Sequence, residues 1–149
     1  MRRIFAVLFA AVMALTLGLA TAEAARKPKK PAAVQVHIDI SKQTMSVKVN
    51  GFPYARWKVS TAGRGYYTPR GTFGVTRMAK VYYSRKYDNS PMPNSIFFHY
   101  GYAIHGSYSV KSLGRPVSHG CVRLHPRNAA ALYALVQRHG QRARITLTN

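Results

Sequence analysis

Cysteine is nearly absent from this chain of 149 residues, which contains Cys121 and no other thiol. A disulfide within the chain is therefore excluded, and so is a lipid-modified cysteine near the N-terminus. Under oxidising conditions, where thiols normally pair, a single cysteine indicates either a bridge between chains or a reactive thiol. A buried, unreactive cysteine is the alternative interpretation, and the residues around Cys121 argue against it.

Acidic residues are also scarce, because three Asp and Glu stand against 23 Lys and Arg, for a formal net charge of +20. Such a chain attracts polyanions over long distances. The basic residues are scattered and form no arginine-rich block after Lys30, which argues against a protein that reads a nucleic-acid groove. For an exported protein we expect acidic peptides, wall polymers or anionic lipid headgroups as partners, and no nucleic acid.

The N-terminus has the pattern of a secretory signal. An apolar run over residues 4–19 follows two arginines, and Ala22 and Ala24 form a small-x-small cleavage site. An uncleaved anchor is the alternative, because the run is long for a signal and short for a membrane span. We expect a signal peptide over residues 1–24 and a basic linker over residues 25–32. The protein would then be exported, in the periplasm or at the cell wall, and would meet the membrane only through its signal segment.

Alternating apolar and polar residues predict strands at the start of the folded region. The alternation runs over residues 34–40 and again over residues 45–49, as in half-buried strands. Asn50-Gly51 tolerates the positive φ of a tight hairpin turn, so a third strand through Trp57 should follow. We expect further strands from residue 73 to 75 and over residues 96–99, 102–105 and 144–148, with a loop over residues 90–94.

One helix is convincing. Apolar residues have helical spacing over residues 129–136, and Gly140 is a suitable stop. Pro126 in the first turn or Asn128 as N-cap would start the helix. The sequence therefore predicts a single mostly-β domain over residues 33–149, a sandwich or partly open barrel with one helix in its C-terminal half.

The residues that carry chemistry lie in a His-Gly pair and, twelve residues later, in the motif Ser-His-Gly-Cys-Val-Arg-Leu over residues 118–124. Only a few per cent of an ordinary thiol is ionised at pH 7, so a cysteine nucleophile needs a base. We expect His105 to accept the proton of Cys121. His119 and Arg123 flank the cysteine, and positive charge at these positions should lower the pKa of the thiol.

Gly120 directly precedes the cysteine, and it allows a sharp backbone turn that exposes the sulfur. The same turn allows successive N–H groups to converge where an oxyanion would form, and one such donor contributes about 10²–10³ in rate. We interpret Ser118 as a structural hydrogen-bonding residue. A zinc site formed by His105, His119, Cys121 and His125 is the alternative chemistry, but a glycine between ligands and an isolated cysteine favour a nucleophile turn.

These motifs resemble the signature of the L,D-transpeptidase (YkuD-like) catalytic domain, and the resemblance extends over residues 33–149. The segment Thr-Pro-Arg-Gly-Thr-Phe at residues 68–73 is similar to a turn of that family. The segment at residues 101–106 matches the family's approach to its histidine. The gap between histidine and serine is short for the family, so we expect a reduced capping loop over the site.

The resemblance implies a role for each matching position. Cys121 would be the nucleophile and His105 the general base, oriented by the backbone carbonyl of Gly106. The amides of Gly120 and Cys121 would form the oxyanion hole, and no metal or cofactor is implied. The positions implied for substrate or oxyanion binding are Gly106, Ser118, His119, Gly120 and Arg123.

The activity implied by the resemblance is acyl transfer between peptidoglycan stem peptides through a thioester on the cysteine. A second stem's amine would resolve the thioester and form a 3-3 crosslink, and carbapenems are the expected inhibitors. Resolution by water would make the enzyme an L,D-carboxypeptidase, and resolution by a protein lysine would anchor that protein to the wall. A non-catalytic basic protein that binds the cell wall is the alternative from a different class.

Overall fold

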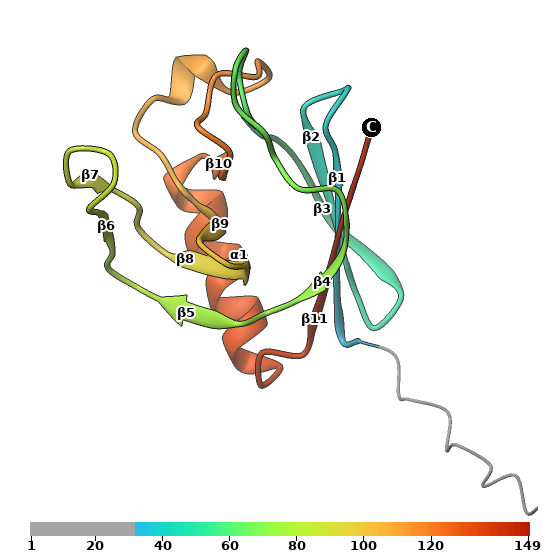
Figure 1. Ribbon diagram of the computed structural model, residues 1–149. Coiled ribbons are helices and arrows are strands. Elements are labelled where there is room, and N and C mark those ends of the chain that lie inside the picture. Colours follow the sequence, from blue (N-terminus) through green and yellow to red (C-terminus); the bar gives the residue numbers. More distant parts are fainter. Residues whose placement is uncertain (1–31) are drawn as a thin grey trace, which may run out of the picture.

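The computed structural model describes residues 32–149 (Figure 1). The expected signal peptide (residues 1–24) and all of the expected basic linker except residue 32 lie outside the described residues. In the part of the chain that is described, no helix is long and apolar enough to cross a membrane.

The first sheet has five strands in the order β3-β2-β1-β11-β4. The C-terminal strand β11 runs parallel to β1 and antiparallel to β4, so the two ends of the domain meet inside one sheet. Asn50 and Gly51 have φ values of 49° and 90° between β2 and β3, which confirms the predicted tight turn. The strands are β1 (Val34–Asp39), β2 (Thr44–Val49), β3 (Phe52–Lys58), β4 (Gly71–Gly74) and β11 (Ala143–Thr148).

The second sheet has four strands in the order β10-β9-β8-β5, and its outermost pair, β9 and β10, is parallel. A small hairpin formed by β6 and β7, here called the β6–β7 hairpin, lies in the chain between β5 and β8. The strands are β5 (Arg77–Ala79), β6 (Tyr83–Ser84), β7 (Ser90–Pro91), β8 (Ser95–His99), β9 (Tyr102–Gly106) and β10 (Val122–Leu124).

The helix α1 (Pro126–Arg138) begins with proline at its first position. Its N-cap is His125, whose Nδ1 accepts a hydrogen bond of 3.2 Å from the Arg127 N–H. The expected start at Pro126 is confirmed, and the alternative of Asn128 as N-cap is wrong. Gly140, with φ of 60°, follows the C-terminal end and takes the left-handed conformation that stops a helix.

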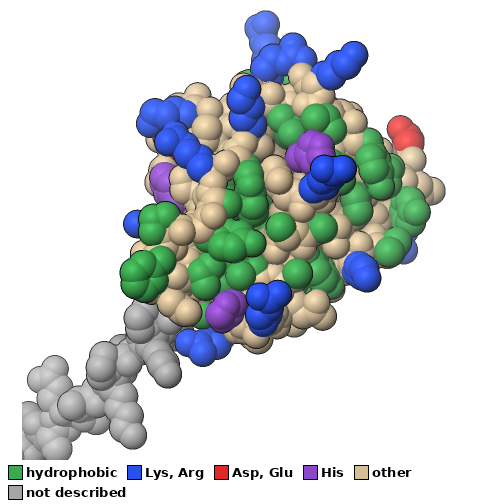
Figure 2. Space-filling view, turned by 180° about the vertical axis from the view of Figure 1, so that it is seen from behind, with side chains coloured by type: hydrophobic (Ala, Val, Ile, Leu, Met, Phe, Trp, Pro, Cys, Tyr) green, Lys and Arg blue, Asp and Glu red, His purple; other side chains and the backbone are tan. Residues whose placement is uncertain are grey.

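A shared core joins both sheets to the helix. Ile38 of the first sheet, Ile104 of the second and Leu132 of α1 are almost completely buried in one cluster. The helix lies against β8 and β9, and the first sheet lies on the other side of the core (Figure 1). The back of the molecule carries Lys and Arg side chains spread over its face and edge (Figure 2).

The structure confirms a mostly-β domain with one α-helix in its C-terminal half, and the described strands form mixed sheets without a closed barrel. The expected loop over residues 90–94 is partly wrong, because Ser90–Pro91 pairs with Tyr83–Ser84. The sequence also did not predict β10. Strands of two or three residues are too short to show a period in the sequence.

Substituting Leu132→Ala tests the shared core. Leu132 is 0% exposed, so its truncation should lower the free energy of unfolding by about 2–5 kcal/mol. Gln137→Ala, at an exposed position of the same helix, should change it by no more than about 0.5 kcal/mol. Chemical denaturation measures both, and equal losses would contradict the placement of α1 on the core.

Candidate active site

The two sequence motifs become neighbouring strands. Arg123 of β10 is opposite His105 of β9, and Val122 is opposite Ile104. Val122 and Ile104 point into the core, with 0% and 1% exposed. Because side chains alternate along a strand, Cys121 joins Arg123 and His105 on the opposite face.

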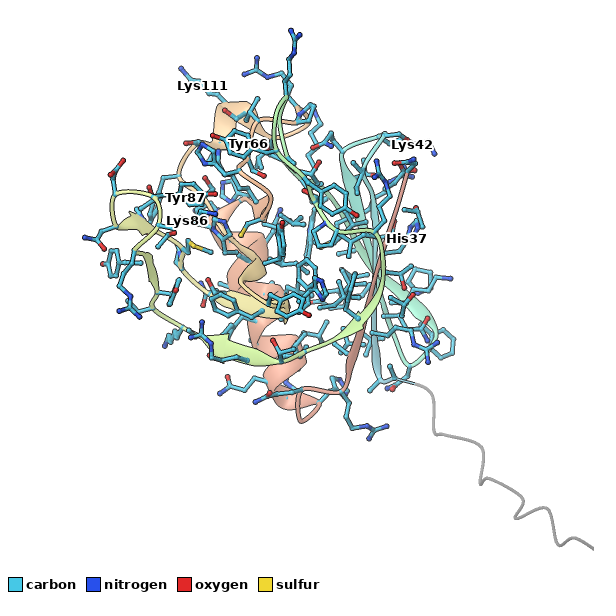
Figure 3. The ribbon with its side chains drawn as sticks, viewed as in Figure 1. His37, Lys42, Tyr66, Lys86, Tyr87 and Lys111 are labelled. Atoms are coloured by element: carbon cyan, nitrogen blue, oxygen red, sulfur yellow. The ribbon has the colours of Figure 1, made fainter. Side chains whose placement is uncertain are left out.

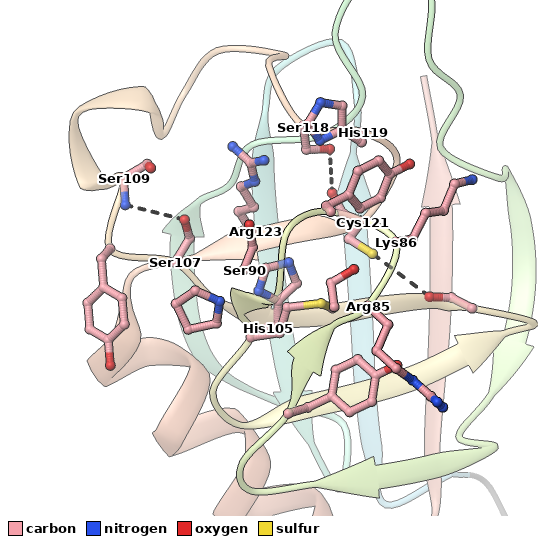
Figure 4. A pocket seen from close by; sticks show the side chains of 17 residues that line it. Arg85, Lys86, Ser90, His105, Ser107, Ser109, Ser118, His119, Cys121 and Arg123 are labelled. Atoms are coloured by element: carbon pink, nitrogen blue, oxygen red, sulfur yellow. Dashed lines mark hydrogen bonds between the residues drawn. The ribbon is translucent and has the colours of Figure 1, made fainter.

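That face is one wall of a cavity of about 470 Å³ (Figure 4). Five of the seven predicted site residues line it, whereas Gly106 and Gly120 shape the backbone around it. The opposite wall comes from the β6–β7 hairpin and its flanks, which the sequence reasoning missed because nothing in those residues shows a motif. The predicted residues that line the cavity are His105, Ser118, His119, Cys121 and Arg123.

His105 is buried with its Nδ1 2.8 Å from the backbone oxygen of Gly106. Since a carbonyl oxygen only accepts, Nδ1 carries the hydrogen, and Nε2 of the neutral ring is free to accept a proton. Burial lowers the pKa of His105 to about 4, helped by the positive charge of Arg123 and opposed by the bond to Gly106. At pH 7 the imidazole is therefore a neutral base.

Burial raises the pKa of the Cys121 thiol above its ordinary value. The Ala103 backbone N–H and the Arg123 guanidinium act in the opposite direction without reversing the shift. Arg123 lowers the pKa of the thiol, as expected of a flanking cation, but desolvation of the thiolate outweighs this effect and the net shift is upward. The resting thiol is therefore protonated and depends on a base for its activation.

Ser118 fixes the turn that presents the cysteine. Its buried hydroxyl donates to the Cys121 carbonyl at 2.6 Å and accepts from the Gly120 N–H at 3.1 Å. Thr68 adds a second support by donating to the Gly120 carbonyl at 2.8 Å. Ser118 is thus a structural hydrogen-bonding residue. It also occupies the Gly120 N–H, which the resemblance had assigned to the oxyanion hole.

Gly120 is required at this turn for two physical reasons. Its φ is +129°, a value that L side chains rarely adopt. A Cβ at this position would lie 2.7 Å from the Tyr67 carbonyl oxygen and 2.7 Å from a ring carbon of Tyr102. The turn before Cys121 therefore depends on the absence of a side chain as much as on backbone freedom.

His119 is exposed and contacts the rings of Tyr66 and Tyr87, which are labelled in Figure 3. It stacks on Tyr87 of the β6–β7 hairpin, with ring centroids 4.4 Å apart, and meets Tyr66 edge-on at 4.5 Å. This aromatic stack joins the catalytic turn to two other segments. The geometry gives His119 a part in holding the hairpin over the cavity.

The geometry does not support the zinc alternative. His125 caps α1, and His119 lies in the aromatic stack. Within residues 32–149, no three His, Cys, Asp or Glu side chains are grouped as metal ligands would be.

Two segments border the cavity. The segment between β9 and β10, which contains the short 3₁₀ helix η1 (Val110–Ser112), supplies six lining residues; that its capping loop is reduced stays a prediction. The β6–β7 hairpin, which the sequence did not indicate, supplies another six through side chains from both of its arms and its turn. Those lining residues are Ser84, Arg85, Lys86, Tyr87, Ser90 and Pro91.

The cavity is lined by the two groups, a thiol and a neutral imidazole, that covalent acyl transfer by a cysteine requires. Comparison with known proteins identifies the family. The family model of the L,D-transpeptidase catalytic domain, YkuD, matches residues 33–145. The chain belongs to this family.

Individual relatives have the same family name. A Bacillus licheniformis protein that bears the name L,D-transpeptidase YkuD is 31% identical over 105 residues, 66% of this chain and 53% of that protein. An L,D-transpeptidase from Mycobacterium smegmatis is 28% identical with a TM-score of 0.69, over 79% of this chain and 59% of that one. The L,D-transpeptidase LdtMt1, solved in complex with imipenem, is 26% identical with a TM-score of 0.67, over 78% and 59%. This chain thus matches between half and three fifths of the length of these relatives.

Substituting Gly120→Ala tests the catalytic turn. The new Cβ would overlap the Tyr67 carbonyl, so we expect the free energy of unfolding to fall by about 2 kcal/mol or more, with loss of Cys121 reactivity. Gly65→Ala is the matched control, because Gly65 also has a positive φ (+84°) but no atom within 4 Å of a Cβ. It should cost only about 1 kcal/mol. Thermal melts and thiol labelling distinguish the two, and similar effects would contradict the close approach at Gly120.

The pKa of His105 predicts a pH-dependent stability. Since the folded pKa is about 4 and the ordinary value is 6.5, the unfolded chain binds more protons between these values. The free energy of unfolding should therefore fall as the pH decreases from 6.5 to about 4, by at most about 1.4 kcal/mol per pH unit. Denaturation at several pH values measures this slope. His105→Gln should flatten it, and an unchanged slope would show that His105 is not the group responsible.

Proposed function

We propose that this protein is an exported L,D-transpeptidase that remodels peptidoglycan by acyl transfer between stem peptides. The observation that carries the proposal is the pairing, in one cavity, of the chain's single thiol with a buried imidazole whose Nε2 is free to accept a proton. Membership of the family agrees with this chemistry.

Acylation begins with a neutral pair. His105 Nε2 takes the thiol proton as Cys121 Sγ attacks the carbonyl carbon of the donor amide, and the carbonyl oxygen becomes an oxyanion. Collapse of this intermediate breaks the C–N bond, and the imidazolium returns the proton to the departing D-alanine amine. The thioester then reacts with an amine of a second stem, which loses its proton to His105 and restores the free thiol.

The oxyanion requires donors that are free when its charge develops. The expected oxyanion-hole donors are the N–H groups of Gly120 and Cys121. The Ser118 hydroxyl accepts from Gly120 and not from Cys121. The Gly120 N–H joins the Cys121 N–H once this amide exchanges its bond to Ser118 for the oxyanion. Arg123 lowers the pKa values that both His105 and Cys121 would otherwise have, so its field favours negative charge at the reacting centre.

The location and the inhibitor are also proposals. The N-terminal sequence supports export to the periplasm or cell wall, where the basic chain would be attracted to anionic wall components. Carbapenems would acylate Cys121, because a strained lactam carbonyl presents an electrophile where the donor amide would lie. A relative solved with imipenem supports this class of ligand.

Covalent trapping and turnover test the mechanism together. Intact-mass measurement should show one carbapenem-sized addition per chain, located at Cys121 and absent from Cys121→Ala. His105→Gln should slow both acylation and muropeptide turnover by about 10²-fold or more, because the proton acceptor is lost. His119→Gln should have a much smaller effect, since His119 lies in the aromatic stack, and equal losses would mean that the base is assigned wrongly.

The products of the same assay distinguish the alternatives. Supplying an acceptor amine should give a crosslinked dimer, whereas hydrolysis alone would indicate a carboxypeptidase. A non-catalytic wall-binding protein predicts that Cys121→Ala retains the wild-type effect on muropeptides. Unchanged muropeptide processing by purified Cys121→Ala would overturn the proposed function.

A further inference from the structure

The cavity beside Cys121 is lined by three cationic side chains, Arg85, Lys86 and Arg123, and by no aspartate or glutamate. These cations have no acidic partner, since the single salt bridge within residues 32–149 joins Lys42 to Asp39, far from the cavity (Figure 3). Arg85 and Lys86 are exposed and Arg123 is half-buried, and a cavity rim with unbalanced positive charge attracts an anionic ligand.

The cations approach from two walls (Figure 4). Arg123 belongs to β10, next to His105, and its field acts on both reacting groups. Arg85 and Lys86 come from the turn of the β6–β7 hairpin, on the other side of Cys121 in Figure 4. A ligand bound at the sulfur would therefore meet positive charge in two directions.

Lys86, one of the two hairpin cations, lies against the aromatic stack. Lys86 Nζ lies 5.5 Å from the ring centroid of Tyr87, and that ring stacks on His119 beside Cys121. Asp88, the acidic residue of the same turn, does not line the cavity. The charge that the hairpin presents to a ligand is thus positive.

We propose that Arg85 and Lys86 select acyl donors that have a free carboxylate on the part of the peptide beneath the hairpin, in addition to the carboxylate of the departing residue. This inference rests on the proposed function and names the substrate class more narrowly, as donors with at least two carboxylates. Amidation of the carboxylate under the hairpin removes the charge that these residues recognise and makes a poorer donor.

Two donors that differ in one group test the selection. They are the same stem tetrapeptide with the side-chain α-carboxyl of its diamino acid either free or as a carboxamide. The wild-type protein should have a kcat/KM about tenfold higher on the carboxylate donor. Arg85→Gln and Lys86→Gln should each lose about threefold on that donor, and the double variant about tenfold, with little change on the carboxamide donor.

Lys80→Gln is the matched control. Lys80 lies between β5 and the β6–β7 hairpin and does not line the cavity, so this variant removes one positive charge without altering the lining. It should leave kcat/KM unchanged on both donors. Equal turnover of the two donors by the wild type would overturn the inference, and so would a double variant that loses the same factor on both.

A binding measurement separates this inference from the proposed function. If no donor is turned over, the proposed function fails. Calorimetry with Cys121→Ala would then still test the selection, because binding needs no thiol. Preferential binding of the carboxylate donor that disappears in the Arg85→Gln/Lys86→Gln background supports the inference, and equal binding of both donors overturns it.

Discussion

Parallel pairing of β9 with β10 sets the geometry on which the site depends. The pair register places Arg123 opposite His105, and strand alternation turns Cys121 toward the same side. The intervening side chains, Ile104 and Val122, are in the core, so a slip of one residue would bury the reacting groups and expose apolar ones. The packing that stabilises the domain therefore also fixes the relative positions of nucleophile and base.

Burial has opposite effects on the two reacting groups. It lowers the pKa of the imidazole and raises that of the thiol, because each loses the hydration that stabilises its charged form. The resting site therefore holds a neutral thiol and a neutral imidazole, and no thiolate–imidazolium ion pair. The positive charge of Arg123 lowers the pKa of the imidazole further and partly offsets the rise in the pKa of the thiol. The site is thus suited to a negative charge that develops during the reaction.

The β6–β7 hairpin forms the second wall of the cavity over the face of β9 and β10 that carries His105 and Arg123. Its base is held by Tyr82, which packs edge-on against Phe97 of β8 with ring centroids 5.1 Å apart. Its turn is held by the stack of Tyr87 on His119. His119 therefore links the cover of the site to the turn that presents the cysteine. Aromatic faces therefore hold this cover at both its base and its turn.

The sequence was sufficient for the residues whose chemistry or period is local. The alternation over β1 and β2, the helical spacing of α1 and the glycine before Cys121 each reflect a constraint within a few residues. The motif also singled out His105 and Cys121, and the structure places both on the lining of one cavity; their roles as base and nucleophile stay a prediction.

Tertiary structure decided the properties that depend on distant segments. The raised pKa of Cys121 comes from burial, which no run of neighbouring residues encodes and which outweighs the lowering by Arg123. The occupied Gly120 N–H depends on where the Ser118 side chain points. The cationic wall from Arg85 and Lys86 reaches the site only because the chain folds back over a strand pair that lies later in the sequence. Desolvation and long-range contact are properties of the assembled fold, and for that reason they could not be predicted from the motif.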